Sequence, residues 1–215
     1  MQITPGTIGP HDLSPREALQ RLREGNFRFL NNLNRNHDLL TMVHETKDGQ
    51  WPFAAILGCM DSRTAVELIF DQSFGDVFSI RIAGNVIGTN ILGSLEYATA
   101  FADSKLIVVL GHTSCGAVKG ACDDIRSGHL TELLNKIRPA VDNVQDIAGE
   151  RSSRNKNFVE AVAVENARMS AAEILRQSTT IRDLVTKGKA GIIPAIYDIA
   201  TGKVNFLDQY ATFQV

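Results

Sequence analysis

Two short stretches of the sequence carry side chains that bind metal ions. "CMDSR", from Cys59 to Arg63, contains a cysteine, an aspartate and an arginine, and "HTSCG", from His112 to Gly116, contains a histidine and a second cysteine. Two thiolates and an imidazole are a known ligand set for zinc that leaves the fourth tetrahedral position open for water or substrate. An open position indicates catalysis, because a structural zinc site normally takes a fourth protein ligand.

The second stretch, taken alone, allows three other interpretations. Gly111 and Gly116 have the spacing of the glycines in a phosphate-binding loop, but Ala117-Val118 stands where that loop needs lysine and serine or threonine. A nucleophilic cysteine activated by the histidine also fits the short spacing. It would give no function to Cys59 or to the Asp61–Arg63 pair of the first stretch. The last alternative is that Cys59, His112 and Cys115 are ordinary buried core residues. This interpretation would be favoured for any one of the three alone, but not for all three at the ends of strands.

The surrounding pattern predicts how the two stretches are positioned. Apolar runs cover residues 52–58, 77–84 and 105–112, and they are typical of parallel strands that are buried on both faces. Each run is followed by a segment of helical character, so the sequence predicts an α/β fold with a mostly parallel central sheet flanked by helices. The carboxyl ends of parallel strands share one sheet edge, so Cys59, His112 and Cys115 are expected to converge.

The remaining elements are predicted from local signals. Ser14-Pro15-Arg16-Glu17 has the form of a capping box and predicts an N-terminal helix. Pro139 should kink or break a helix in its neighbourhood. One long helix is expected over residues 158–184. Residues 191–207 predict two strands joined by a turn at Thr201-Gly202, with an added strand at the sheet edge.

The composition limits the class of protein. We expect one domain over residues 1–215, with an N-terminal helical arm over about residues 1–50 and an α/β core over residues 51–215. A net charge of −2 gives no electrostatic basis for binding nucleic acid or an anionic membrane. No apolar run is long enough to span a bilayer, and no signal peptide is visible, so we expect a cytoplasmic protein, or a periplasmic one if a signal peptide was removed. Three cysteines, an odd number, argue against a disulfide framework.

Together, "CMDSR" and "HTSCG" resemble the motifs of the β-class carbonic anhydrases in composition, order and separation. "FDQSFGDVFSIRIAGNV" and "GSLEYA" are also similar to family segments, and the resemblance extends from the N-terminal helix to the final hairpin. It implies one Zn²⁺ per subunit, held by Cys59, His112 and Cys115. It also implies reversible hydration of CO2 to bicarbonate and a proton, in a homodimer that often pairs into a homotetramer, a dimer of dimers.

The resemblance assigns roles to further residues. It implies that Arg63 holds Asp61 away from the zinc, and that Asp61 accepts the hydrogen bond of the zinc-bound hydroxide and orients it. If Arg63 released it, Asp61 could become a fourth ligand and close the site. The substrate-binding residues implied by the resemblance are Gln50 for bicarbonate, Phe78 and Tyr97 as aromatic walls of the CO2 pocket across the dimer interface, and the backbone N–H of Gly116 for the bound anion.

Two alternatives and one departure accompany this resemblance. The same zinc ligands serve relatives that hydrolyse carbonyl sulfide or carbon disulfide. The second alternative is a binding or scaffold protein without enzymatic activity, in which zinc only stabilises the fold. Such a protein would have a fourth protein ligand on the zinc at all pH values and would not need Arg63. Some family members hold an inhibitory bicarbonate with a Trp-Arg-Tyr triad; here Ile56 stands at the tryptophan position, while Arg81 and Tyr197 match the other two.

Overall fold

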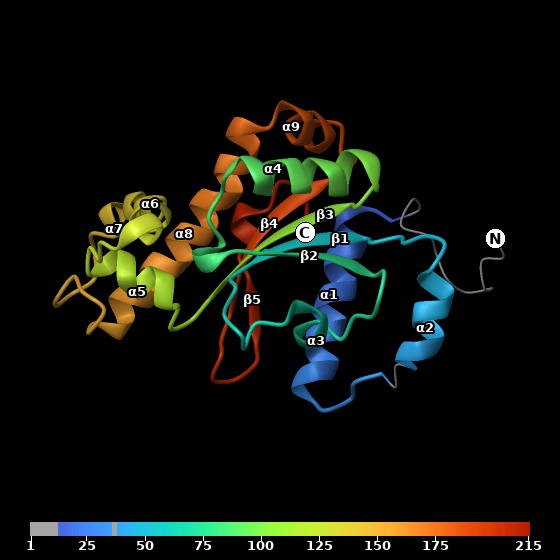
Figure 1. The fold of residues 1–215 in the computed structure, drawn as a ribbon, viewed down its shortest axis with the longest axis horizontal. Helices are drawn as coiled ribbons and strands as arrows, with labels where there is room; N and C mark the ends of the chain where they lie inside the picture. Colours follow the sequence, from blue (N-terminus) through green and yellow to red (C-terminus); the bar gives the residue numbers. More distant parts are fainter. Residues whose placement is uncertain (1–12, 36–37) are drawn as a thin grey trace.

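A five-stranded sheet forms the centre of the protein in a computed structural model, which describes residues 13–35 and 38–215 (Figure 1). The strands are β1 (Ala54–Gly58), β2 (Val77–Arg81), β3 (Leu106–His112), β4 (Gly191–Tyr197) and β5 (Val204–Phe206). Their order is β2-β1-β3-β4-β5; the first four are parallel, and β5 pairs antiparallel with β4. The predicted α/β class, the mostly parallel sheet and the terminal edge strand are therefore confirmed.

Burial differs between the three strands expected to be covered on both faces. Every residue of β1 and of β3 is buried, as predicted. The prediction is wrong for β2, whose residues are all half-buried or exposed. The physical reason is position: β2 lies at the edge of the sheet and is hydrogen-bonded to β1 alone among the described strands.

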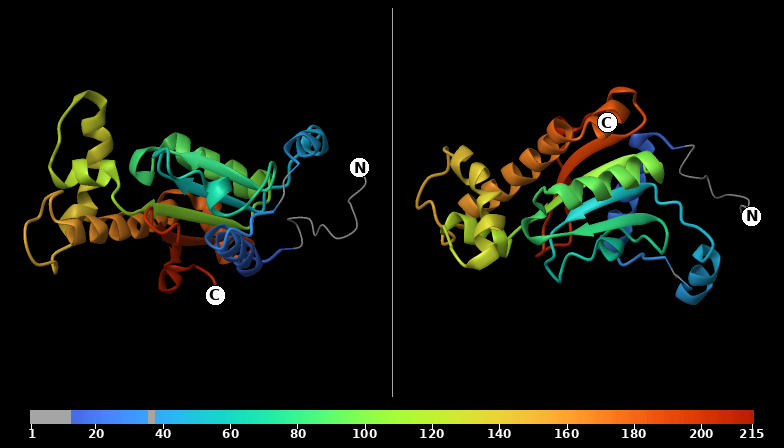
Figure 2. Two further views of the ribbon diagram at one scale, coloured as in Figure 1. Left: turned by 90° about the horizontal axis from the view of Figure 1, so that it is seen from below. Right: turned by 45° about the horizontal axis from the view of Figure 1, so that its top comes forward.

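Helices cover both faces of the sheet and one end of it. They are α1 (Pro15–Leu30), α2 (Leu39–Thr46), α3 (Val66–Ile69), α4 (Thr89–Glu96), α5 (Gly116–Cys122), α6 (Gly128–Asn135), α7 (Arg138–Asn143), α8 (Lys156–Gln177) and α9 (Thr179–Thr186). Short 3₁₀ turns cover Ala83–Asn85 and Asp208–Tyr210, and a π-helical turn over Tyr97–Phe101 continues α4. Figures 1 and 2 show α1 and α3 on one face, α4, α8 and α9 on the other, and α5 to α7 as a lobe beyond one end.

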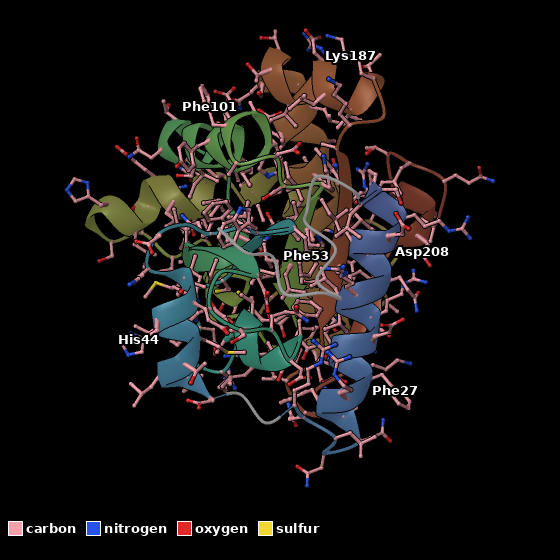
Figure 3. The ribbon with its side chains drawn as sticks, turned by 90° about the vertical axis from the view of Figure 1, so that its right-hand side faces the viewer. Phe27, His44, Phe53, Phe101, Lys187 and Asp208 are labelled. Atoms are coloured by element: carbon pink, nitrogen blue, oxygen red, sulfur yellow. The ribbon has the colours of Figure 1, made fainter. Side chains whose placement is uncertain are left out.

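The apolar core has three parts that follow these layers. One cluster joins α1 and α3 to one face of the sheet and includes Phe53, which Figure 3 labels near α1. A second joins α4, α8 and α9 to the opposite face. The third fills the α5–α7 lobe, and it contains Cys59 and Cys115 among its buried members. In the described part of the chain, no helix is both long and apolar enough to cross a membrane.

The helix expected over residues 158–184 is two helices, so that prediction is wrong. Helix α8 ends at Gln177, and α9 begins at Thr179. Ser178 causes the break: its hydroxyl accepts a hydrogen bond from the Ile181 amide at 3.1 Å, as a helix cap, and donates to Glu96 at 2.5 Å. The break expected near Pro139 is confirmed, because Pro139 lies in the first turn of α7.

The N-terminal arm contains two helices that pack differently. Helix α1 begins with the predicted capping box: the Ser14 hydroxyl accepts from the Glu17 amide at 3.2 Å, and the Glu17 carboxylate accepts from the Ser14 amide at 2.8 Å. Helix α2 has no buried residue, and both views in Figure 2 show it to one side of the sheet. Residues 1–12 and 36–37 of the expected arm lie outside the described residues.

Candidate metal site

The ends of β1 and β3 bring together the three expected metal ligands. Gly58, the last residue of β1, pairs with Leu110 in β3, so Cys59 lies near the end of β3, where His112 stands. Cys115 follows at the start of α5. The ligand atoms of the three side chains lie within 4.8 Å of one another, and all three residues are buried. The convergence expected from a parallel sheet is confirmed.

The His112 ring has one nitrogen free to bind a metal. Its Nδ1 lies 3.0 Å from the Thr113 carbonyl oxygen. Since a carbonyl can only accept, Nδ1 carries the proton and Nε2 carries the lone pair. Nε2 is buried and has no hydrogen-bond partner among the described residues. An unpaired buried nitrogen is costly, and a metal ion at this position would satisfy it.

The two sulfur atoms are arranged as a pair that attracts a cation. Cys59 Sγ and Cys115 Sγ are 3.9 Å apart, and the Gly84 amide donates to Cys59 Sγ at 3.4 Å. Hydrogen bonding from the Cys115 thiol lowers the pKa of Cys59 to about 4 and raises the pKa of Cys115. A lowered pKa favours the thiolate, which is the form of cysteine that binds a metal ion. Sulfur and imidazole donors in this number are the ligands that zinc prefers, so the residues fit that metal.

Asp61 lies beside the ligand group but does not belong to it. Arg63 donates to both oxygens of Asp61, from Nε to Oδ1 at 2.9 Å and from Nη2 to Oδ2 at 2.7 Å, and the Arg63 amide adds a bond of 3.0 Å to Oδ1. These bonds hold the pKa of Asp61 well below its usual range. Among the described residues the group of potential metal ligands at this site has three members and does not include Asp61.

Arg81 holds the turn between β1 and Asp61, a function that the sequence pattern did not indicate. Its Nε donates to the Cys59 carbonyl at 3.1 Å, and its Nη2 donates to the Asp61 carbonyl. Thr64 strengthens the same turn, because its hydroxyl bonds the Cys59 carbonyl at 3.0 Å. Arg81 reaches the turn because it pairs with Gly58 across the β1–β2 ladder. At the expected tryptophan position, Ile56 is fully buried in β1.

Of the expected substrate-binding residues, Gly116 lies beside a metal ligand, and the other three lie away from the ligand group. Gly116 is exposed and is the first residue of α5, next to Cys115. Gln50 is exposed and precedes β1, so it lies at the opposite end of this strand from Cys59. The Phe78 and Tyr97 rings meet edge to face, with centroids 6.2 Å apart. They line a surface cavity of about 480 Å³ that no metal ligand lines.

Comparisons with known proteins agree with this geometry. A family model described as "Carbonic anhydrase" matches residues 54–204, which is more than half of the chain. Carbonic anhydrase 2 of Mycobacterium tuberculosis is 34% identical over 91% of this chain and 94% of its own length. A carbonic anhydrase of Mycolicibacterium smegmatis is 32% identical over 89% of this chain and 92% of its own length.

Solved structures agree at the level of the fold. The β-carbonic anhydrase CcaA superposes with a TM-score of 0.70 at 26% identity, covering 90% of this chain and 93% of its own. A tetrameric β-carbonic anhydrase of Sordaria macrospora superposes with a TM-score of 0.66 at 26% identity, covering 78% of this chain and 89% of its own. With the family model, the mycobacterial relatives and the Cys-His-Cys group in agreement, the chain belongs to the β class of the carbonic anhydrase family.

Proposed function

We propose that this chain catalyses the reversible hydration of CO2 to bicarbonate and a proton with one zinc ion held by Cys59, His112 and Cys115. The observation that carries the proposal is a buried group of three ligands with Asp61 ion-paired beside it instead of joined to it. Such a group leaves a fourth position for a water molecule. Relatives named carbonic anhydrase, aligned over about 90% of the chain, support the same reaction.

The residues around the metal position have separate tasks in this reaction. When bound, zinc polarises a water molecule and lowers the pKa of that water from 15.7 to about 7. Asp61 is an acceptor-only carboxylate whose orientation Arg63 determines through two side-chain bonds. A lone pair of Asp61 that Arg63 leaves free accepts a hydrogen bond from the attacking water and orients it toward the carbon of CO2. The Gly116 backbone N–H bonds an oxygen of the anionic product.

The pH dependence of activity tests this proposal. The zinc-loaded chain is expected to hydrate CO2 in a stopped-flow assay with a rate that rises from about pH 6.5 to 9, and the zinc-stripped chain is expected to be inactive. Two thiolates reduce the effective charge of the metal, which makes it a weaker acid catalyst than zinc with three imidazoles. The low pKa of Asp61 keeps this carboxylate charged over the whole range, so its titration adds no step to the profile.

Two results would contradict the proposal: no hydration by the zinc-loaded chain at any pH, or a maximum rate below about pH 6.5. The same preparation is assayed with carbonyl sulfide. Hydrolysis of carbonyl sulfide without hydration of CO2 would assign the site to the analogue instead.

We also propose that the chain forms a homodimer or a dimer of dimers. Tyr97 is 56% exposed and Phe101 is 81% exposed, and their rings stack with centroids 6.1 Å apart. Figure 3 shows Phe101 at the surface of the molecule, and the outer edge of β2 pairs with no other strand of the described residues. Exposed apolar surface of this kind is typical of an interface between proteins. The related Sordaria macrospora enzymes are described as tetrameric.

The position of Gln50 supports the same assembly. The strand between Gln50 and Cys59 has five residues, which span about 16 Å. Gln50 therefore cannot contact substrate at the metal site of its own chain. In our proposal Gln50, Phe78 and Tyr97 contribute to the site of the partner chain, so that an isolated chain has an incomplete site.

Replacing Phe101 with aspartate tests the assembly. We expect the mass at micromolar concentration, measured by light scattering, to fall to that of a smaller species, since a charge would be buried in the interface. CO2 hydration should fall with it. Leu130→Asp is the control, because Leu130 is also exposed but lies on α6, in the lobe at the other end of the molecule. A Phe101→Asp chain with wild-type mass would contradict this location for the interface.

A further inference from the structure

The loop that carries His112 is attached to the hairpin between β4 and β5 through Thr113. The Thr113 carbonyl accepts the bond from His112 Nδ1 at 3.0 Å, which leaves Nε2 for the metal. The Thr113 amide donates to the Tyr197 carbonyl at 3.0 Å. The Thr113 hydroxyl accepts from the Ile199 amide at 3.1 Å and faces Asp198 Oδ1 at 3.4 Å as a donor. Both the backbone and the side chain of Thr113 are therefore held from the same hairpin.

The next residue along the loop explains why this attachment matters. Ser114 has a φ of +56°, in the left-handed region that residues other than glycine rarely adopt. This conformation costs about 1 kcal/mol or more, so it persists where surrounding contacts hold it. Ser114 lies between His112 and Cys115, and its conformation determines how these two ligands face each other. A loop of this kind needs support from outside its own residues.

The hairpin is itself well anchored. The Asp198 carboxylate accepts from the Ala200 amide at 2.8 Å, and the Gly202 amide donates to the Asp198 carbonyl at 2.8 Å. On the other side, the buried Asn26 of α1 donates to the Gly202 carbonyl at 3.0 Å and accepts from the Val204 amide at 3.0 Å. A continuous set of hydrogen bonds thus runs from α1 through the hairpin to Thr113 and His112.

We propose that Thr113 is a positioning residue for the metal ligand His112, and that it acts through the bonds of its hydroxyl to the β4–β5 hairpin. The proposal rests on the zinc site of the proposed function. Groups that orient a metal-binding histidine typically change metal affinity by 10-fold to 100-fold when they are removed. Loss of the Thr113 hydroxyl releases the loop around Ser114, so His112 Nε2 is presented less accurately and zinc is held less tightly.

Thr113→Val removes the hydroxyl while nearly keeping the shape of the side chain, and Thr113→Ser keeps the hydroxyl. Zinc affinity is measured by competition with a chromophoric chelator, and metal geometry by the visible absorption of the cobalt-substituted protein. We expect zinc affinity to fall about 10-fold or more in Thr113→Val, with an altered cobalt spectrum, and to stay within about 2-fold of wild type in Thr113→Ser. Thr99→Val is the matched control: Thr99 is buried, and its hydroxyl donates to the Leu95 carbonyl of its own helix at 2.8 Å.

The outcomes separate this inference from the proposed function. Wild-type affinity and spectrum in Thr113→Val, or equal losses in Thr113→Val and Thr99→Val, overturn the role of Thr113 and leave the zinc site intact. Failure of the wild-type chain to bind zinc overturns the proposed function and this inference with it. If Thr113→Val does not fold, judged by circular dichroism, Thr113→Ala replaces it under the same criteria.

Discussion

Replacing Asp61 with asparagine is expected to lower kcat for CO2 hydration about 100-fold or more, while zinc content stays at one ion per chain. Asparagine keeps the size of the side chain but loses the charge, and its amide nitrogen cannot accept the hydrogen bonds of Arg63 or of the attacking water. The three bonds from Arg63 show how strongly the site specifies a carboxylate here. Stopped-flow kinetics and elemental analysis of zinc measure the two quantities.

The chain contains a matched control for this substitution. Asp124 and Arg126 have the same spacing as Asp61 and Arg63, and Arg126 Nη2 lies 3.0 Å from Asp124 Oδ1. This second pair is exposed and is not part of the metal-ligand group. Asp124→Asn should therefore keep kcat within about 2-fold of wild type, because an exposed ion pair contributes little to the free energy of folding and this one lies outside the metal-ligand group. Full activity in Asp61→Asn, with zinc bound, would remove Asp61 from the mechanism.

Replacing Cys59 with alanine is expected to abolish both zinc binding and CO2 hydration. Two ligands hold zinc far less well than three, and this substitution removes one of the two sulfur donors of the group. Zinc at about 100 times its dissociation constant stabilises a protein by about 2.7 kcal/mol. For a chain of this size that corresponds to an increase in Tm of roughly 5–10 °C. Thermal unfolding with zinc and with a chelator measures this difference.

Cys122 provides the control for the loss of a buried cysteine. It is buried in the same apolar cluster as Cys59 but is not a member of the ligand group. Cys122→Ala should lose some stability from the small cavity that it leaves, yet its Tm should still rise with zinc as in the wild type. The Cys59→Ala chain should show no such rise. A normal zinc-dependent rise in Cys59→Ala would show that the metal is bound elsewhere.

Local patterns were sufficient to predict much of the fold. The buried apolar runs before Cys59 and through His112 indicated parallel strands, and parallel strands place both ends at one edge of the sheet. The convergence of the ligands followed from that topology. The exposure of β2 was missed because an apolar run looks the same at the edge of a sheet as at its centre. The break at Ser178 was missed because the hydrophobic period continues across it, while the capping bond is formed by a single hydroxyl.

The residues that support the site could not be predicted in the same way. Arg81 serves the turn after Cys59 because of the β1–β2 register, which no spacing along the chain reveals. The contacts of Thr113 depend on a hairpin more than 80 residues later. In both cases the missing information is a long-range pairing.

The sulfur atoms of Cys59 and Cys115 are also part of the apolar cluster that fills the α5–α7 lobe. They therefore belong both to the group of potential metal ligands and to the contact between this lobe and the sheet. Zinc binding, in the proposed function, is therefore expected to be coupled to the local order of the lobe, because the ligand sulfurs pack among its apolar side chains. A substitution at either cysteine would then change the packing of this part of the core as well as the metal-ligand group, so these two residues are expected to contribute to folding as well as to chemistry.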